Sequence, residues 1–155
     1  MNNKIKILIV EDDIFYLKMV KRHVNNLKRA VFPKQSFEIL TSSTADDCME
    51  KLDKDTTIVI MDYYLENDQG EVVFPGIYLL QAINLFCDDC KVIVVSGQQS
   101  KQIAINLIKT GIYEYIVKDK DTFIRLASTL DKIIKSINSK KYLQTTEKGT
   151  SGLNS

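Results

Sequence analysis

The stretch IKILIVEDD, residues 5–13, decides the fold, because a short apolar run broken by one lysine ends directly in three acids. Four similar runs follow along the chain, namely FEILT (37–41), TIVIM (57–61), KVIVV (91–95) and IYEYIV (112–117). Helical patterns alternate with these runs, which is typical of successive βαβ units. We therefore predict an α/β fold, a doubly wound five-stranded parallel sheet with helices on both faces. FEILT is the least apolar run and suits an edge, whereas the other four suit burial on both faces.

The segments between the strands carry apolar residues at helical spacing. We predict five helices, over residues 14–29, 44–53, 77–86, 100–110 and 121–138. The first two are expected to cover the same side of the sheet. Gly111 is expected as a left-handed C-cap of the fourth helix. Beyond residue 138 the sequence is polar, so we predict a polar tail or linker, disordered, over 139–155.

Composition indicates one domain, over residues 1–138, and excludes some classes of partner. The chain has 155 residues and is 45% hydrophobic, which suits a single core. Its 21 basic and 20 acidic side chains give no general field for nucleic acid or for a membrane surface. The N-terminal stretch has no signal-peptide pattern, and no apolar run approaches the roughly 20 residues that span a bilayer. We expect a cytoplasmic location.

The cysteines and the single histidine have ordinary roles in our interpretation. Cys87 and Cys90 form a C-x-x-C spacing that is compatible with a redox pair or half of a zinc site. Only Cys48 and His23 remain as further soft ligands, whereas structural zinc sites take four ligands in close pairs. We therefore predict free thiols and a helical histidine.

Five polar side chains stand where the strands end. Glu11 and Asp12 follow the first run, Asp62 the third, Ser96 the fourth and Lys118 the fifth. Carboxyl ends of parallel strands meet at one edge, where open sheets bind ligands. Three converging carboxylates repel one another, so we expect them to hold a hard divalent cation. A hydroxyl and an ammonium remain for phosphoryl oxygens, and the set predicts the formation of an aspartyl phosphate.

Simpler roles remain open for these positions. Asp12 or Asp13 could cap the following helix, and Asp62 could be a turn residue. Ser96 could be structural and Lys118 a solvated lysine. Their joint occurrence favours the site.

In order and position these residues resemble the receiver domains of two-component response regulators, over about residues 4–138. The resemblance implies the flavodoxin-like receiver fold, with Asp62 as the phosphate-accepting residue. It also implies Mg²⁺ as the cofactor, held by Glu11, Asp12, Asp62 and the backbone carbonyl of Tyr64.

The same resemblance assigns roles around the acceptor. Ser96 and Lys118 match the residues that contact the phosphoryl group, and Tyr115 matches the aromatic switch position. The implied partners are a sensor histidine kinase or phosphotransfer protein and a downstream output protein or domain, with a phosphorylation-dependent homodimer also open. Such a protein is a signalling phosphoacceptor rather than an enzyme acting on other substrates. The string over residues 96–126 resembles receivers that precede sigma-factor-dependent ATPase activators, so both a stand-alone receiver and a fragment of a larger regulator stay open.

The chain departs from the family pattern next to the site. Lys118 is followed by Asp119 instead of proline, so we predict a trans peptide bond. Glu66 stands where proline is common, and an insertion occupies residues 66–75. Its Val72, Val73 and Phe74 suggest an apolar lid that slows hydrolysis; a solvent-exposed hairpin or partner-binding loop is the alternative.

Three other functions are compatible with such a fold. A phosphorylation-independent pseudo-receiver would normally lack one of the key residues. An aspartate-nucleophile phosphatase would need an acid where Tyr64 stands, and a dinucleotide or flavin binder would need a glycine-rich turn where EDDIF stands.

Overall fold

The computed structural model describes residues 4–65 and 74–150. Its central sheet is parallel, with the strand order β2-β1-β3-β6-β7. The strands are β1 (Ile5–Val10), β2 (Phe37–Ser42), β3 (Ile58–Met61), β6 (Lys91–Ser96) and β7 (Glu114–Val117). The helices are α1 (Ile14–Val31), α2 (Ala45–Lys51), α3 (Gly76–Phe86), α4 (Lys101–Thr110) and α5 (Thr122–Thr150). The predicted fold class is confirmed.

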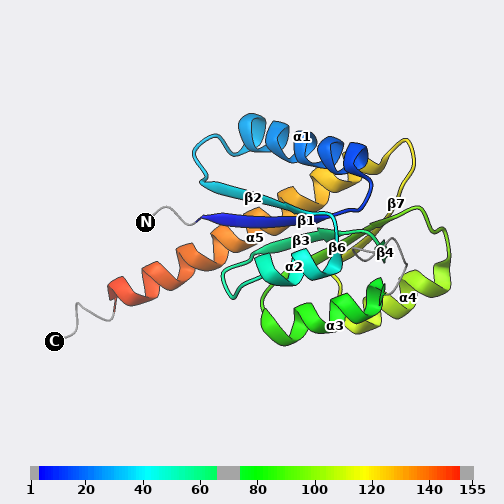
Figure 1. Cartoon of the computed structure of the whole chain (residues 1–155). Helices are drawn as coiled ribbons and strands as arrows, with labels where there is room; N and C mark the ends of the chain where they lie inside the picture. The colour runs from blue at the N-terminus through cyan, green and yellow to red at the C-terminus, as the bar shows by residue number, and fades with distance from the viewer. Residues whose placement is uncertain (1–3, 66–73, 151–155) are drawn as a thin grey trace.

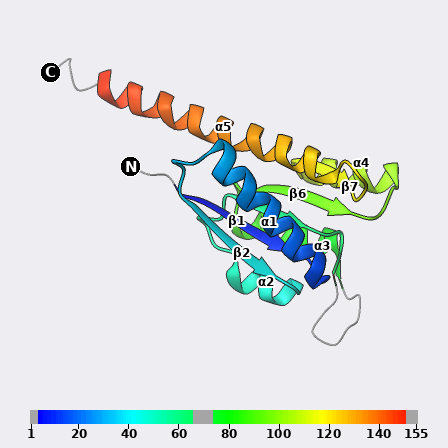
Figure 2. The ribbon, with the colours of Figure 1, turned by 90° about the horizontal axis from the view of Figure 1, so that it is seen from above.

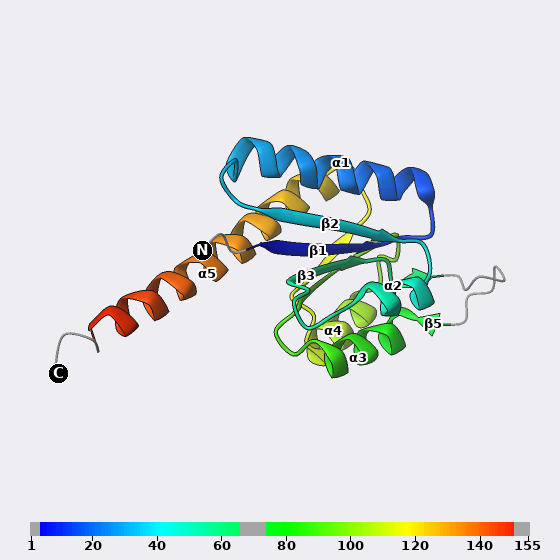
Figure 3. The ribbon, with the colours of Figure 1, turned by 60° about the vertical axis from the view of Figure 1, so that its left-hand side comes forward.

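The sheet separates two apolar layers, because side chains alternate along its buried strands. Ile5, Ile7 and Ile9 of β1 pack in the cluster that contains α1 and α5 residues. Leu8 and Val10 point to the opposite cluster, which contains residues of α2, α3 and α4. Figures 1 and 3 show α1 on one side of the sheet and α2, α3 and α4 on the other.

The prediction that the first two helices share one side was wrong. Strand β1 lies between β2 and β3, so the chain leaves β1 in one direction and returns past it in the other. Crossovers between parallel strands are right-handed, and a reversal of direction therefore moves the next helix to the opposite face.

The two edge strands differ from the central ones in burial. FEILT forms β2 and pairs only with β1, as predicted for an edge. The run at 112–117 was predicted to be buried on both faces, but β7 is the other edge and only Ile116 of that strand is buried. Gly111 adopts a left-handed conformation, with φ of 104°, as the C-cap of α4, which confirms its predicted role.

Helix α5 is longer than its sequence pattern predicted, and it continues through residues 139–150. The disordered tail predicted there is therefore corrected for those residues, whereas 151–155 lie outside the described part. The extension lacks proline and contains Lys, Leu, Gln and Glu, which favour helix, and adding residues to an existing helix needs no new nucleus. Figure 2 shows this end of α5 projecting beyond the sheet. A boundary of the folded domain near residue 138 stays a prediction.

No helix within 4–65 and 74–150 is long and apolar enough to cross a bilayer.

Removing residues 139–155 should change the melting temperature by less than about 4 °C, because every described residue in that stretch except the half-buried Lys141 is exposed. Circular dichroism should show a loss of helical signal with the transition itself retained. Leu130→Ala is the matched control in the packed part of α5, where Leu130 is buried, and it should cost about 2–5 kcal/mol. A truncation as damaging as Leu130→Ala would show that the extension is docked.

Candidate phosphoryl-transfer site

The predicted site residues gather at the carboxyl edge of the sheet. Glu11 directly follows β1, Asp62 follows β3 and Lys118 follows β7, while Ser96 is the last residue of β6. The parallel register aligns these ends: Val10 pairs with Met61, and Ser96 pairs with Val117. Residues that are more than a hundred positions apart in the sequence therefore face one another.

Three carboxylates form an acidic cluster. Glu11, Asp12 and Asp62 each offer an oxygen, and these oxygens all lie within 4.8 Å of one another. Glu11 is only 4% exposed, and burial together with the charge of Asp62 raises its pKa to about 7. Two like charges about 4 Å apart repel by about 4 kcal/mol at an effective dielectric constant of 20. Such a hard-oxygen donor set fits a divalent cation.

Lys118 supplies a positive charge to this cluster. Its Nζ atom lies 2.9 Å from Asp62 Oδ2 and 3.0 Å from Glu11 Oε2. Burial alone would lower the pKa of Lys118. The hydrogen bonds to Asp62 and to Glu11 outweigh this effect, so the pKa of Lys118 is raised. Nζ also lies 4.2 Å from the centre of the Tyr16 ring, at a distance suited to a cation–π contact. One ammonium thus joins the buried Glu11 and the half-buried Asp62.

Of the acids that follow β1, Asp13 is the one that caps helix α1. Its Oδ1 accepts hydrogen bonds from the N–H groups of Phe15 and Tyr16, at 2.9 and 3.1 Å, and so caps α1. The Asp13 N–H in turn donates to Glu11 Oε1 at 3.2 Å. Asp12 is not the cap, and its carboxylate belongs to the acidic cluster.

Ser96 and Tyr115 meet at one residue of the loop before α4. Ser96 is 1% exposed, and its Oγ accepts a hydrogen bond from the Gln98 N–H at 3.3 Å. The Tyr115 hydroxyl donates to the Gln98 carbonyl at 2.7 Å. A change at Ser96 can therefore reach Tyr115 through the backbone of Gln98.

Residues 7–131 match the family model of the response regulator receiver domain. The chain belongs to this family. Solved receiver domains have the same fold as the chain drawn in Figure 1.

Several known proteins are similar to this receiver at low sequence identity. A response regulator of Rickettsia bellii described as NtrX-like is 26% identical over 115 residues, which cover 74% of this chain and 22% of the relative. The chain thus spans about a fifth of that relative's length. A signal receiver domain of a Luxo repressor protein from Vibrio parahaemolyticus has a TM-score of 0.69 at 21% identity, covering 90% of this chain and 97% of the other. A receiver domain from Clostridium thermocellum has a TM-score of 0.67 at 24% identity, covering 90% and 98%.

The receiver's insertion is closed by a short antiparallel ladder, in which β4 (Tyr64–Leu65) pairs with β5 (Phe74–Pro75). The Tyr64 N–H points to Asp62 Oδ1 at 3.4 Å, and the ring of Tyr64 is partly exposed. The predicted metal contact of the Tyr64 carbonyl stays a prediction. Most of the predicted lid, residues 66–73, lies outside the described residues.

The cysteines of the receiver are thiols that resist ionisation. Burial raises the pKa of Cys48 to about 12 and also raises the pKa values of Cys87 and Cys90. The Cys87 thiol donates to the Thr56 carbonyl at 3.2 Å. Because the thiolate is the reactive form, these raised pKa values disfavour redox chemistry at the three cysteines. Among the described residues, the acidic cluster is the one group found with metal-ligand spacing.

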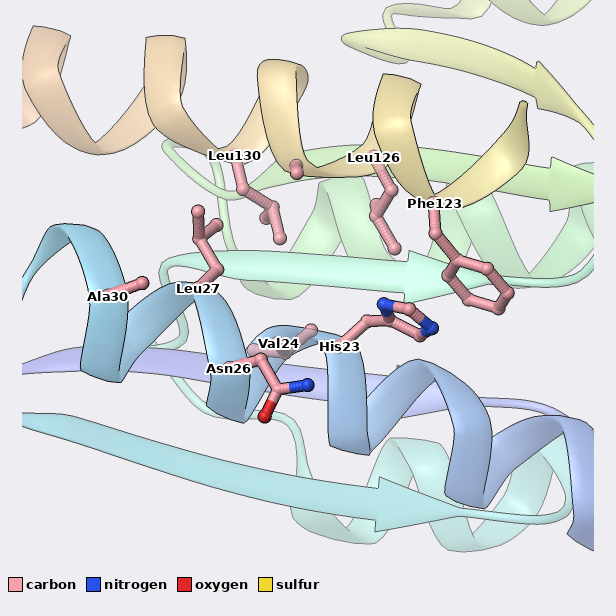
Figure 4. Close-up of a pocket in the computed structure, with 9 residues that line it drawn as sticks. His23, Val24, Asn26, Leu27, Ala30, Phe123, Leu126 and Leu130 are labelled. Atoms are coloured by element: carbon pink, nitrogen blue, oxygen red, sulfur yellow. The ribbon is translucent and has the colours of Figure 1, made fainter.

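His23 belongs to the packing between α1 and α5. Its ring stacks on Phe123 with centroids 3.9 Å apart and planes at 11°. Figure 4 shows the two rings at one end of a groove of about 240 Å³, whose other lining residues are mostly apolar. The expected ordinary helical role of His23 agrees with this contact.

Tyr16, Thr122 and Arg125 also lie around the site and were not predicted from the sequence. Tyr16 contacts the Lys118 ammonium, and the other two bind the backbone next to Lys118. The only signal in the sequence was Asp119 in place of proline after Lys118. As predicted, that peptide bond is not cis, since no cis bond occurs among the described residues.

Gly76, beside the site, should not tolerate a side chain. A Cβ atom there would lie 2.5 Å from the Tyr63 carbonyl oxygen and 3.0 Å from the Tyr63 Cα. Because both atoms are backbone, Gly76→Ala should lower the free energy of unfolding by about 1–3 kcal/mol in denaturant titrations. Gly149→Ala is the control, since nothing lies within 4 Å of a Cβ there and alanine favours helix. Equal effects of the two substitutions would contradict the close approach.

Proposed function

We propose that this receiver accepts a phosphoryl group on Asp62 from a histidine kinase or phosphotransfer protein and then changes its partner-binding surface. The observation that carries the proposal is the position of Lys118, whose ammonium bridges Asp62 and Glu11 within the acidic cluster. A carboxylate held against a lysine beside two further acids is suited to phosphoryl transfer, which depends on positioning and charge.

The transfer forms one bond and breaks one. An Asp62 carboxylate oxygen attacks phosphorus of a phosphohistidine, and the bond between phosphorus and the donor nitrogen breaks with its electron pair remaining on nitrogen. Lys118, already 2.9 Å from Asp62, offsets charge on the transferring oxygens. The product is an acyl phosphate on Asp62. The protein thus acts as a signalling phosphoacceptor that catalyses only its own phosphorylation and dephosphorylation.

The acidic cluster fits Mg²⁺ as the cofactor. Glu11, Asp12 and Asp62, with the Tyr64 carbonyl, would hold the ion. Bound there, Mg²⁺ supplies positive charge next to the acceptor carboxylate. The oxygen-only donor set and the raised pKa of Glu11 support this choice, since a cation relieves the repulsion between acids.

The switch uses the contacts at Gln98. In the proposal, the Ser96 hydroxyl turns toward a phosphoryl oxygen, so the Gln98 N–H loses its acceptor at Ser96. The Tyr115 hydroxyl, now on the Gln98 carbonyl, then changes partner. A local hydrogen bond thereby biases a surface residue. The partners we propose are an output protein or domain, or a second copy of the receiver, and the location is the cytoplasm.

Incubation with a small acyl phosphate and Mg²⁺ should label one residue, Asp62, as read by mass spectrometry of proteolytic fragments. Asp62→Asn should abolish labelling, because an amide is not a nucleophile for phosphorus, and should preserve the circular dichroism spectrum. Ser96→Ala is a useful companion, since it keeps the nucleophile and should still be labelled. Labelling of Asp62→Asn at the wild-type level would refute the assignment; absence of labelling in the wild type would favour a phosphorylation-independent interaction module.

Calorimetric titration should show that Asp12→Ala weakens Mg²⁺ binding on the order of tenfold or more, and more than Glu11→Ala does. The oxygens of Glu11 already accept from Lys118 and from the Asp13 N–H, and its raised pKa leaves it partly protonated near neutrality.

Asp13→Ala is the control for this titration, because it removes the α1 cap, which costs about 0.5–2 kcal/mol of stability, and spares the cluster. Equal Mg²⁺ affinity in the wild type, Asp12→Ala and Glu11→Ala would rule out the proposed metal site.

A further inference from the structure

The first turn of α5 holds the backbone on both sides of Lys118. The Val117 carbonyl accepts hydrogen bonds from Thr122 Oγ1 at 3.0 Å and from Arg125 Nη2 at 3.1 Å. On the other side, the Asp119 N–H donates to Thr122 Oγ1 at 2.7 Å. Thr122 is 1% exposed, so these two hydrogen bonds of Thr122 are shielded from water.

Arg125 also reaches across this segment to the Asp119 side chain. Its Nη2 atom lies 2.8 Å from both Asp119 Oδ1 and Oδ2, while Oδ1 additionally accepts from the Asp121 N–H at 2.8 Å. One guanidinium nitrogen thus contacts three oxygens, two of them after Lys118 in the chain and one before it. We call these contacts among Val117, Asp119, Thr122 and Arg125 the loop clamp.

The loop clamp matters because the loop after Lys118 has no proline ring to restrict its backbone. Neither residue 119 nor residue 120 is proline, so no ring fixes a backbone angle there, and hydrogen bonds must restrict the loop instead. The Lys118 N–H is tied to the Ser96 carbonyl at 2.8 Å. Arg125 joins the carbonyl before Lys118 to the carboxylate after it, so the backbone from which the Lys118 side chain extends is restrained on both sides.

We propose that Arg125 is a positioning residue for phosphoryl transfer, acting through the loop clamp to hold the Lys118 ammonium on Asp62. This inference rests on the proposed function of Asp62 and Lys118. Arg125 does not contact the acidic cluster in any of its hydrogen bonds, which go to Val117 and Asp119. Its substitution should therefore disturb the step that uses Lys118 and leave cation binding by the carboxylates intact.

The test measures the rate of Asp62 labelling by a small acyl phosphate at saturating Mg²⁺, together with Mg²⁺ affinity by calorimetry. Arg125→Ala should slow labelling on the order of tenfold, because small displacements of a charged group in a transfer site are costly, with Mg²⁺ affinity changed less than twofold. Arg125→Lys keeps the positive charge but replaces the planar guanidinium with an ammonium, and should give an intermediate rate. Lys135→Ala, which removes another ion pair of α5, with Asp131, should match the wild type.

A double variant separates positioning from a general structural effect. In a Lys118→Met background, Arg125→Ala should slow labelling less than twofold further, since its target is gone. An unchanged rate in Arg125→Ala, equal losses in both backgrounds, or a parallel loss of Mg²⁺ affinity would each overturn the inference.

The wild type, Arg125→Ala, Lys118→Met and the double variant also distinguish this inference from the proposed function itself. If the wild type were not labelled, the proposed function would fail, and denaturant titration would still test the loop clamp. Arg125→Ala should then destabilise the wild type more than it destabilises Lys118→Met, because part of its effect passes through the Lys118 ion pairs. Equal destabilisation in the two backgrounds would overturn the clamp as a positioning device.

Discussion

The ion pairs of Lys118 with Asp62 and Glu11 are the interaction on which this receiver's site depends. Burial at the carboxyl edge of the sheet disfavours several negative charges in one place, and the raised pKa of Glu11 expresses that cost. One ammonium offsets part of the repulsion without a bound cation. The acids therefore stay together, with Asp62 held against the ammonium of Lys118.

The remainder of the fold determines where that ammonium lies. Parallel pairing brings the ends of β1, β3, β6 and β7 to one edge of the sheet. Their side chains alternate between the two apolar layers, and this alternation specifies the register of the strands. The first turn of α5 then holds the loop after β7, and Tyr16 of α1 covers the lysine from the side. Since α1 and α5 share one face of the sheet, both contacts come from the same layer.

Much of this could be predicted from the sequence because chemistry and position coincide at strand ends. The acids after IKILIV, Asp62 and Lys118 follow apolar runs whose period is readable without a structure. The sheet faces covered by α1 and α2 were predicted wrongly because they depend on the order of the strands. The end of α5 was predicted too early because an exposed helix has no apolar stripe. Arg125 and Thr122 escaped notice because hydrogen bonds from side chains to a distant backbone leave no periodic signal.

The most direct test of Asp62 as the phosphoryl acceptor is a crystal structure with Mg²⁺ and beryllium fluoride, a mimic of the phosphoryl group. We expect the mimic on the Asp62 carboxylate, in contact with the Lys118 ammonium and the Ser96 hydroxyl, with the ion among Glu11, Asp12 and Asp62. A mimic bound to another residue would contradict the role of Asp62. A Lys118 ammonium that stays on Glu11 and does not contact the mimic would contradict the role of Lys118.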